Sequence, residues 1–431
     1  MSPLTRRQLL MGTAATATGA AIGRAAASGS TRRAVTPRLP NPATSGIDHI
    51  VVVVMENRSF DHYLGWLPGA DGKQAGLRYP DDKGVLHPTH HLTERQGCGF
   101  NDPDHSYQGG HTQLNGGRCD GFRKGANDDF ALGYYTAADL PLYAPLVAQT
   151  TVFDRWFCSI LSSTYPNRYY THAARTEQID NSMVTNNMPT IWDRLGAAGV
   201  PATYYFNDLP FLALWGEKYL PIAKPFETFL AQAASGTLPS FSYIDPFFLG
   251  EDQGGSNDDH PHADIHRGQA FLSLIISSLV NSPLWPKTAL VITYDEWGGF
   301  FDHVRPPRLP DDAPTNDFDH SQAGFRVPAF VLSPYARRGR IEHATFDHTS
   351  ILKLVEWRWG LTPLAPRDAA ARNIATALDF SKPNFSVPSL PTVTDPGPHI
   401  CGAPTVGMAL EDSQWLPLRD YVQRSAWRHV V

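Results

Sequence analysis

The chain has 431 residues, of which 42% are hydrophobic and 11% aromatic, a composition typical of a folded globular protein with a sizeable core. The formal net charge is -6 at pH 7, and no run of basic residues is interleaved with aromatic ones. The sequence therefore excludes the usual electrostatic footprint of a nucleic-acid-binding protein, and we expect no nucleic-acid partner. Glycine (35) and proline (36) are spread along the whole chain, which indicates ordered loops rather than low-complexity segments.

The first residues have the pattern of an export signal. Arg6-Arg7 precede a weakly apolar stretch, and Ala25-Ala26-Ala27 has the A-x-A form of a signal-peptidase site. We interpret residues 1–27 as a twin-arginine signal peptide and residues 28–45 as a flexible leader. A membrane anchor is the alternative, but the apolar stretch is too short to span a bilayer. We therefore expect the twin-arginine machinery to export the protein to the periplasm, the cell envelope or the exterior.

A continuous apolar run over residues 50–55 ends abruptly at Glu56 and Asn57. Its β-branched residues favour a strand buried on both faces of a parallel sheet, and such sheets bind ligands just past the carboxyl ends of their strands. Glu56 and Asn57 place two hard oxygen donors at that edge. The alternative is a buried strand followed by a solvated turn.

Residues 66–150 differ from the rest of the chain because they are rich in Gly, Asp and His and show little periodicity. We predict that they form a loop-rich cap over the sheet edge. The four cysteines, Cys98, Cys119, Cys158 and Cys401, include no C-x-x-C pair, so a structural zinc site is not expected. An oxidising destination permits disulfides, and we expect Cys98 to pair with Cys119, although spacing alone does not fix the pairing.

Hydroxyl residues precede Arg168 in the segment 161–170. At a strand-to-helix turn, Thr164 could direct its oxygen at a metal while backbone N–H groups face an anion. Contact with a metal lowers the pKa of a hydroxyl, so Thr164 is a candidate nucleophile toward phosphorus. Arg168 either stabilises anionic oxygens or braces the turn. The alternative for this segment is a helix N-cap formed by Ser163 or Thr164.

A second apolar run, residues 290–294, leads directly into Asp295 and Glu296. Two strands would then deliver carboxylates to one sheet edge, where together with Glu56 and Asn57 they form a set of oxygen donors suited to one divalent cation. Such donors favour calcium or magnesium, and zinc stays open. The alternative is an exposed turn, which the two glycines that follow would also fit.

Histidines are concentrated in Asp-rich loops. They are His105, His111, His260, His262 and His348. A protonated histidine can bind a phosphoryl oxygen, and a histidine can protonate a leaving group near neutral pH. A single histidine is more often structural, so their number indicates a site without identifying which of them take part.

Strand-like runs alternate with helical patterns over residues 268–282 and 349–359, and a further apolar run covers residues 327–333. This alternation predicts an α/β fold with a doubly wound, mostly parallel sheet. Since no linker separates two domains, we predict a single catalytic domain over residues 46–431.

Six short blocks occur along the chain: E-N-R-S-F-D-H at 56–62, T-Y-P-N-R at 164–168, D-D-H-P at 258–261, D-E-W-G-G-F-F-D-H-V at 295–304, R-V-P at 326–328 and D-H-T-S at 347–350. In this order they resemble the blocks of the bacterial phosphoesterase family, which contains phospholipases C and a group of acid phosphatases. The resemblance extends over residues 47 to 380. It implies an alkaline-phosphatase-like, three-layer α/β/α fold and metal-assisted phosphoryl transfer through a covalent phospho-enzyme.

The resemblance also implies roles for individual residues. The metal ligands would be Glu56, Asn57, Asp295 and Glu296. The catalytic candidates are Thr164, His260 and His303, and the substrate-binding candidates are His105, Arg168 and His348. The family often has His where this chain has Trp297. The longer haemolytic phospholipases carry C-terminal β domains that do not follow here, so we expect at most peripheral contact with membranes.

The predicted activity is that of a secreted phospholipase C. It would hydrolyse the phosphodiester of a phosphatidylcholine-like glycerophospholipid to diacylglycerol and a phosphorylated head group. The alternative is a broad-specificity acid phosphatase on the same site. A sulfatase is disfavoured, because Thr164 stands where the C/S-x-P-x-R pattern has Cys or Ser. A binding protein without catalysis is disfavoured by the combination of ligand candidates and Thr164.

Overall fold

The structure, a computed structural model, describes residues 39–251, 254–312, 318–401 and 414–431. The predicted signal peptide and residues 28–38 of the predicted leader lie outside the described residues. The end of the leader contains a short 3-10 helix, Pro42–Thr44, capped by the side chain of Asn41.

An eight-stranded sheet forms the centre of the fold, with the strand order β13-β6-β12-β11-β1-β10-β8-β9. Its strands are β1 (His49–Met55), β6 (Thr151–Phe153), β8 (Ala202–Phe206), β9 (Ala223–Pro225), β10 (Phe241–Ile244), β11 (Thr288–Tyr294), β12 (Ala329–Leu332) and β13 (Arg340–Glu342). Neighbouring strands are parallel except at β12, which runs antiparallel to both β11 and β6. The predicted α/β fold with a mostly parallel sheet is confirmed, and the apolar run at 327–333 supplies its antiparallel strand.

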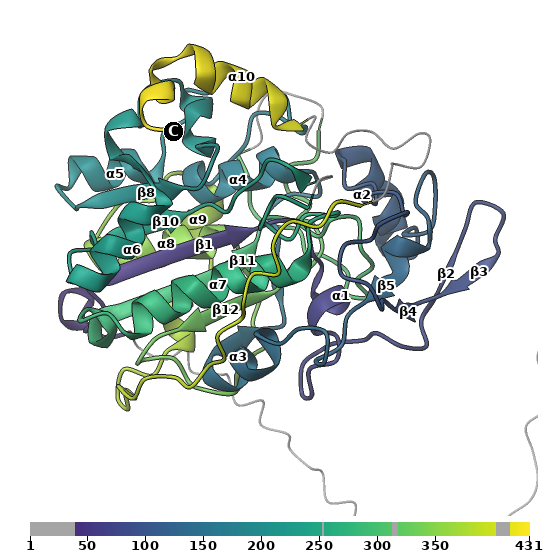
Figure 1. Cartoon of the computed structure of the whole chain (residues 1–431), viewed down its shortest axis with the longest axis horizontal. Helices are drawn as coiled ribbons and strands as arrows, with labels where there is room; N and C mark the ends of the chain where they lie inside the picture. The colour runs from purple at the N-terminus through teal and green to yellow at the C-terminus, as the bar shows by residue number, and fades with distance from the viewer. Residues whose placement is uncertain (1–38, 252–253, 313–317, 402–413) are drawn as a thin grey trace, which may run out of the picture. The chain divides into compact units, whose positions relative to one another are not determined.

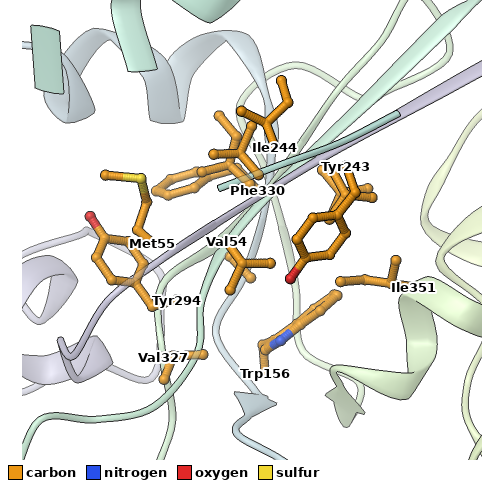
Figure 2. Packing of buried hydrophobic residues seen from close by; sticks show 14 of the residues in the cluster. Val54, Met55, Trp156, Tyr243, Ile244, Tyr294, Val327, Phe330 and Ile351 are labelled. Carbon is orange, nitrogen blue, oxygen red and sulfur yellow. The ribbon is translucent and has the colours of Figure 1, made fainter. Parts of the chain in front are cut away.

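Strand β1 lies in the middle of the sheet, which explains its unbroken apolar sequence. It pairs in parallel with β11 over its whole length, from His49 opposite Thr288 to Met55 opposite Tyr294. Both faces of these strands are covered, and Figure 2 shows Val54 and Met55 packed among Tyr294, Phe330 and neighbouring apolar side chains. Because the two strands end in register, the residues that follow them lie side by side.

Helices cover both faces of the sheet, as the three-layer prediction requires (Figure 1). On one face α6 (Phe226–Ser235) packs against α7 (Ile265–Val280), and on the other α4 (Thr164–Ala173) packs against α8 (Thr349–Trp359) and α5 (Ile191–Ala197). The remaining α-helices in the described residues are α1 (Phe60–Leu64), α2 (Tyr107–Leu114), α3 (Tyr143–Gln149), α9 (Pro366–Ala370) and α10 (Leu416–Arg424). No helix in this part of the chain has both the length and the apolar character that a bilayer span needs.

The segment after α1 gathers at the end of the sheet toward which β1 points (Figure 1). It contains α2 and the short strands β2 (Arg78–Pro80), β3 (Leu86–Pro88), β4 (His90–His91) and β5 (Gly133–Tyr134). A further two-stranded sheet joins β7 (Trp156–Phe157) to β14 (Phe346–Asp347). The placement of α2 brings its preceding loop to the edge where β1 and β11 end.

The disulfide joins Cys98 to Cys401, so the predicted pairing of Cys98 with Cys119 is wrong. Cys119 and Cys158 are buried free thiols. The chain before Cys401 runs back along α7, where the Ser273 hydroxyl donates to the carbonyl of Pro391 at 3.2 Å. This return path brings together two cysteines separated by 303 residues, and such a path cannot be read from the spacing of cysteines.

We predict that the Cys98→Ser/Cys401→Ser double variant loses about 2–4 kcal/mol of unfolding free energy, because a disulfide that closes a long loop restricts the unfolded chain. Urea denaturation measures the loss. A reductant should lower the stability of the parent protein by a similar amount and leave the double variant unchanged. Equal stability of the variant and the parent would contradict the prediction.

Candidate active site

Four oxygen-bearing side chains meet where β1 and β11 end. Glu56 and Asn57 follow β1, Asp295 and Glu296 follow β11, and all four are fully buried. The backbone N–H of Asn57 donates to Oδ1 of Asp295 at 3.1 Å. Asn57 has a φ of 56°, a left-handed conformation that asparagine tolerates better than most residues, and this turn folds the chain across the sheet edge. The structure therefore brings the four predicted ligands together.

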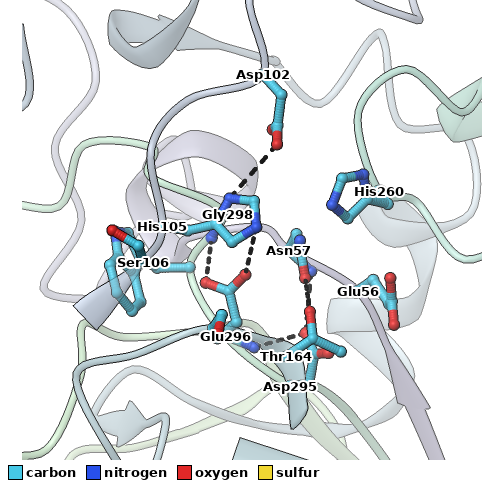
Figure 3. A network of polar contacts seen from close by, with 12 residues as sticks. Glu56, Asn57, Asp102, His105, Ser106, Thr164, His260, Asp295, Glu296 and Gly298 are labelled. Carbon is cyan, nitrogen blue, oxygen red and sulfur yellow. Dashed lines mark hydrogen bonds and ion pairs between the residues drawn. The ribbon is translucent and has the colours of Figure 1, made fainter. Parts of the chain in front are cut away.

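Thr164 faces this cluster from the first turn of α4 (Figure 3). Its hydroxyl lies 3.4 Å from Oδ1 of Asn57 and is fully buried. The N-cap residue of α4 is Ser163, and its side chain makes no capping hydrogen bond. The alternative interpretation correctly places Ser163 at the N-cap, but the hydroxyl of Thr164 faces the cluster. Of the backbone N–H groups in this first turn, that of Tyr165 donates to Oδ1 of Asn181 at 2.8 Å and that of Asn167 donates to the carbonyl of Ser163 at 3.4 Å. Pro166 has no N–H, so these groups are not directed at the cluster.

Arg168, one turn further along α4, holds the carboxylates in place. Its Nε donates to Asp295 at 3.1 Å, and Nη1 donates to Asp245 at 2.7 Å. Its Nη2 lies 3.2 Å from Oε1 of Glu56. The guanidinium is fully buried over the ring of Phe248, at 4.8 Å from the ring centroid. The sequence left two roles open for Arg168, binding anionic oxygens of the substrate or bracing the turn. These contacts favour the bracing role.

The cluster contains more negative charge than Arg168 offsets. Burial raises the pKa of Glu56 well above its usual range, and the neighbouring Asp295 raises it further. Burial likewise raises the pKa of Glu296. Among the described residues, neither carboxylate oxygen of Glu56 receives a hydrogen bond, and neither does Oε1 of Glu296. Buried oxygens without donors are costly unless a cation binds them, so Glu56, Asn57, Asp295 and Glu296 have the donor chemistry for a hard divalent cation. Ligand atoms of Glu56, Glu251 and His260 also lie within 4.8 Å of one another at this edge.

His105 reaches the cluster from the loop before α2. Its Nε2 lies 3.9 Å from Oε1 of Glu296, and its Nδ1 lies 3.6 Å from Oδ2 of Asp102. Burial disfavours the charged ring, but the carboxylates of Glu296 and Asp102 outweigh burial and raise the pKa of His105 to about 9. The structure thus places a cationic imidazole beside the predicted ligands, where it can bind an anionic phosphoryl oxygen.

His260 lies opposite His105, with the two ring centroids 5.6 Å apart. Its Nδ1 contacts the carbonyl of Pro261 and lies 3.3 Å from Oε2 of Glu251. Its Nε2 is buried and has no hydrogen-bond partner in the described part of the chain. Burial, followed by the charge of His105, lowers the pKa of His260 well below its usual range. Figure 3 shows both rings bordering the space above Asn57.

His348 lies behind the site rather than in it. One ring nitrogen, Nε2, is 2.6 Å from the backbone carbonyl of Asp295, and the other accepts from the indole N–H of Trp156 at 3.2 Å. Burial lowers the pKa of His348 to about 4. Since both ring nitrogens already have partners, we infer that His348 supports the backbone of Asp295.

His303 belongs to a different cluster. It contacts Asp61 through Nδ1 and lies 3.2 Å from Asp71 through Nε2. Arg326 is buried at the centre of this network and binds both Asp61 and Asp302 at 3.0 Å. The network ties the turn after β1 to the turn after β11, so His303 is placed to stabilise the base of the site.

The structure adds two acidic residues that the sequence interpretation did not single out. Asp245 and Glu251 both follow β10, the parallel neighbour of β1 on the side away from β11. The signal was a four-residue apolar run, Phe241–Ile244, interrupted by a serine and followed by Asp245. So short a run does not identify a strand by itself, but its position in a parallel sheet places its carboxyl end at the same edge.

The sequence model of the Phosphoesterase family matches residues 47–362. The chain belongs to this family. Non-specific phospholipase C1 of Arabidopsis thaliana is 32% identical over 77% of this chain and 71% of its own length. Phospholipase C B of Mycobacterium tuberculosis is 32% identical over 80% of this chain and 81% of its own length. The predicted family and the predicted enzyme class, a phosphoric diester hydrolase, are confirmed.

Two solved structures align with this phosphoesterase at low sequence identity. A protein of the alkaline phosphatase superfamily from Vibrio parahaemolyticus aligns with a TM-score of 0.40 and 9% identity, covering 78% of this chain and 72% of that chain. The lipoteichoic acid synthase LtaP from Listeria monocytogenes aligns with a TM-score of 0.43 and 9% identity, covering 90% of this chain and 94% of that chain.

We predict that divalent cations stabilise the phosphoesterase through Glu56. At a cation concentration of 100 times Kd, the unfolding free energy of chelator-stripped protein should rise by about 2.7 kcal/mol, measured by urea denaturation with calcium, magnesium and zinc in turn. The Glu56→Gln variant should gain much less, because it removes one charge from the ligand set. His303→Gln, a matched change in the other cluster, should keep the gain. An unchanged gain in Glu56→Gln would rule out this site.

Proposed function

We propose that this phosphoesterase is a phospholipase C that cleaves the phosphodiester of a glycerophospholipid such as phosphatidylcholine, releasing diacylglycerol and a phosphorylated head group. The observation that carries the proposal is the buried Thr164 hydroxyl beside Asn57, at the edge where Glu56, Asp295 and Glu296 gather. Relatives named phospholipase C align over most of the chain. They support a diester substrate.

Thr164 is the proposed nucleophile. Its oxygen would attack phosphorus in line with the departing oxygen and form a covalent phospho-threonine. A divalent cation on Glu56, Asn57, Asp295 and Glu296 would lower the pKa of the hydroxyl and neutralise phosphoryl charge. The cationic ring of His105 would hold an anionic phosphoryl oxygen. Arg168 keeps the carboxylates oriented so that this arrangement exists before the substrate binds.

His260 is the proposed acid and base, because its Nε2 is buried, free of a hydrogen bond within the described residues, and borders the reaction space. It would protonate the departing alkoxide and then accept a proton from the water that attacks phospho-threonine. One residue can be the acid in the first step and the base in the second, because the second step reverses the first with water in place of the departing alcohol.

We also infer that the twin-arginine machinery exports the protein. The support is the sequence of residues 1–27, with Arg6-Arg7 and Ala25-Ala26-Ala27. The disulfide between Cys98 and Cys401 fits an oxidising destination. Mass spectrometry of the exported protein should find the signal removed near Ala27. An N-terminus that still contains Arg6 and Arg7 would contradict cleavage.

We predict that Thr164→Ala lowers kcat by about 10³-fold or more, as loss of a nucleophile does in other covalent enzymes. Thr164→Ser should keep measurable turnover because it retains a hydroxyl. Thr171→Ala is a matched control: Thr171 is buried on the same helix, but its hydroxyl lies 3.0 Å from that of Tyr243, and this variant should keep most of the turnover. If the Thr164→Ala variant retained activity, the covalent mechanism through Thr164 would be excluded.

The substrate is tested with the same preparation. Phosphatidylcholine in mixed micelles should yield diacylglycerol, and p-nitrophenyl phosphorylcholine, a diester, should be hydrolysed with a higher kcat/KM than p-nitrophenyl phosphate, a monoester. The reverse order, without release of diacylglycerol, would support the acid phosphatase instead.

A further inference from the structure

The C-terminal segment of the chain contacts the active site, although it lies outside the residues that the family model matches. Trp415, at the start of α10, is fully buried, and its indole N–H donates to Oε1 of Glu251 at 3.2 Å. The Trp415 ring stacks on Phe248, with centroids 4.2 Å apart, and Phe248 lies under Arg168. The segment therefore packs directly behind the residues that hold the carboxylates.

The same segment holds the helix that carries the nucleophile. The hydroxyl of Tyr165, which follows Thr164, donates to the backbone carbonyl of Gln414 at 2.8 Å. Its ring also packs against Trp415, with centroids 5.2 Å apart. Adjacent residues, Gln414 and Trp415, thus contact the first turn of α4 and Glu251.

Glu251 in turn faces His260. Its Oε2 lies 3.3 Å from Nδ1 of His260, and the same nitrogen contacts the carbonyl of Pro261. A carbonyl only accepts hydrogen bonds, so Nδ1 must carry the hydrogen. In the neutral ring the lone pair is then on Nε2, the nitrogen that borders the reaction space. A carboxylate behind the far nitrogen of a histidine fixes both the tautomer and the ring orientation.

We propose that Glu251 is the positioning residue for His260 and that Trp415 holds Glu251 in place. Contacts from the C-terminal segment would thereby orient His260, the proposed acid and base of the reaction. This inference rests on the proposed function, in which His260 exchanges protons with the substrate. It adds a role for residues outside the blocks that carry the family resemblance.

The proton transfers balance in both steps. In the first, the bond from Thr164 Oγ1 to phosphorus forms and the bond from phosphorus to the departing oxygen breaks, while the hydroxyl proton passes through Nε2 of His260 to the departing oxygen. In the second, the oxygen of water bonds to phosphorus and the bond to Oγ1 breaks. One proton of that water passes through Nε2 back to Oγ1. Glu251 takes no part in these proton transfers and keeps the ring oriented while it is protonated.

Two substrates separate this role from a purely structural one. The alkoxide that leaves phosphatidylcholine is a strong base and needs a proton, whereas the p-nitrophenolate that leaves p-nitrophenyl phosphorylcholine does not. Glu251→Gln should lower kcat/KM for phosphatidylcholine by about 10²-fold or more, within the range that general acid–base catalysis supplies, and lower kcat/KM for the aryl ester by about tenfold or less. The measured quantity is the ratio of the two kcat/KM values, because kcat/KM does not include the hydrolysis of phospho-threonine that both substrates share.

Trp415→Phe keeps the ring stacked on Phe248 and removes the N–H that donates to Glu251. It should shift the ratio in the same direction, by a smaller factor. Trp427→Phe is the matched control: Trp427 is also buried in the C-terminal segment, but its N–H donates to the carbonyl of Gly216 at 2.9 Å, and this variant should leave the ratio unchanged.

Equal losses on both substrates would overturn the positioning role, and so would an unchanged ratio in Glu251→Gln. A fall in bound divalent cation in that variant, measured by elemental analysis, would also overturn it, because Glu251 would then be a metal ligand. If the proposed function itself fails, the parent protein hydrolyses neither ester, so the two failures are distinguishable.

Discussion

The parallel, in-register pairing of β1 with β11 is the constraint on which the rest of the site depends. Met55 lies opposite Tyr294, so the first residues after both strands must occupy one small volume at the sheet edge. Those residues include Glu56, Asp295 and Glu296. A slip of one residue in this pairing would turn the side chains to the other face of the sheet and disperse the ligand set.

Bringing buried carboxylates together is costly, and much of the surrounding structure offsets that cost. Arg168 binds Glu56, Asp245 and Asp295 from beneath, and His105 faces Glu296 from the cap side. These contacts do not reach every oxygen, since Oε2 of Glu56 receives no hydrogen bond from the described residues. A cation would complete the balance, and the same charge would activate Thr164. In the proposed mechanism, the cation that would stabilise the site would therefore also assist the reaction.

Features that depend on long local patterns could be predicted from the sequence. Strands β1 and β11 are continuous apolar runs, and α8 occupies the residues that its periodicity indicated. Features that depend on tertiary contacts could not. The apolar run of β10 is too short to be identified as a strand from the sequence. The cysteine that pairs with Cys98 follows a segment that runs back along α7, and the sequence does not indicate this path. His303 occurs in a family block, but a buried Arg326 and Asp61 hold it in a separate network.

In the proposed mechanism, the adjacent ends of β1 and β11 hold one cation that activates Thr164. Crystals soaked with manganese and orthovanadate would locate both the cation and the nucleophile, because manganese is identified by its anomalous scattering. We expect one manganese bound by oxygens of Glu56, Asn57, Asp295 and Glu296, with vanadium bonded to Oγ1 of Thr164. Manganese bound only in the cluster of Asp61, Asp302 and His303, or vanadium bonded to a different side chain, would contradict this mechanism.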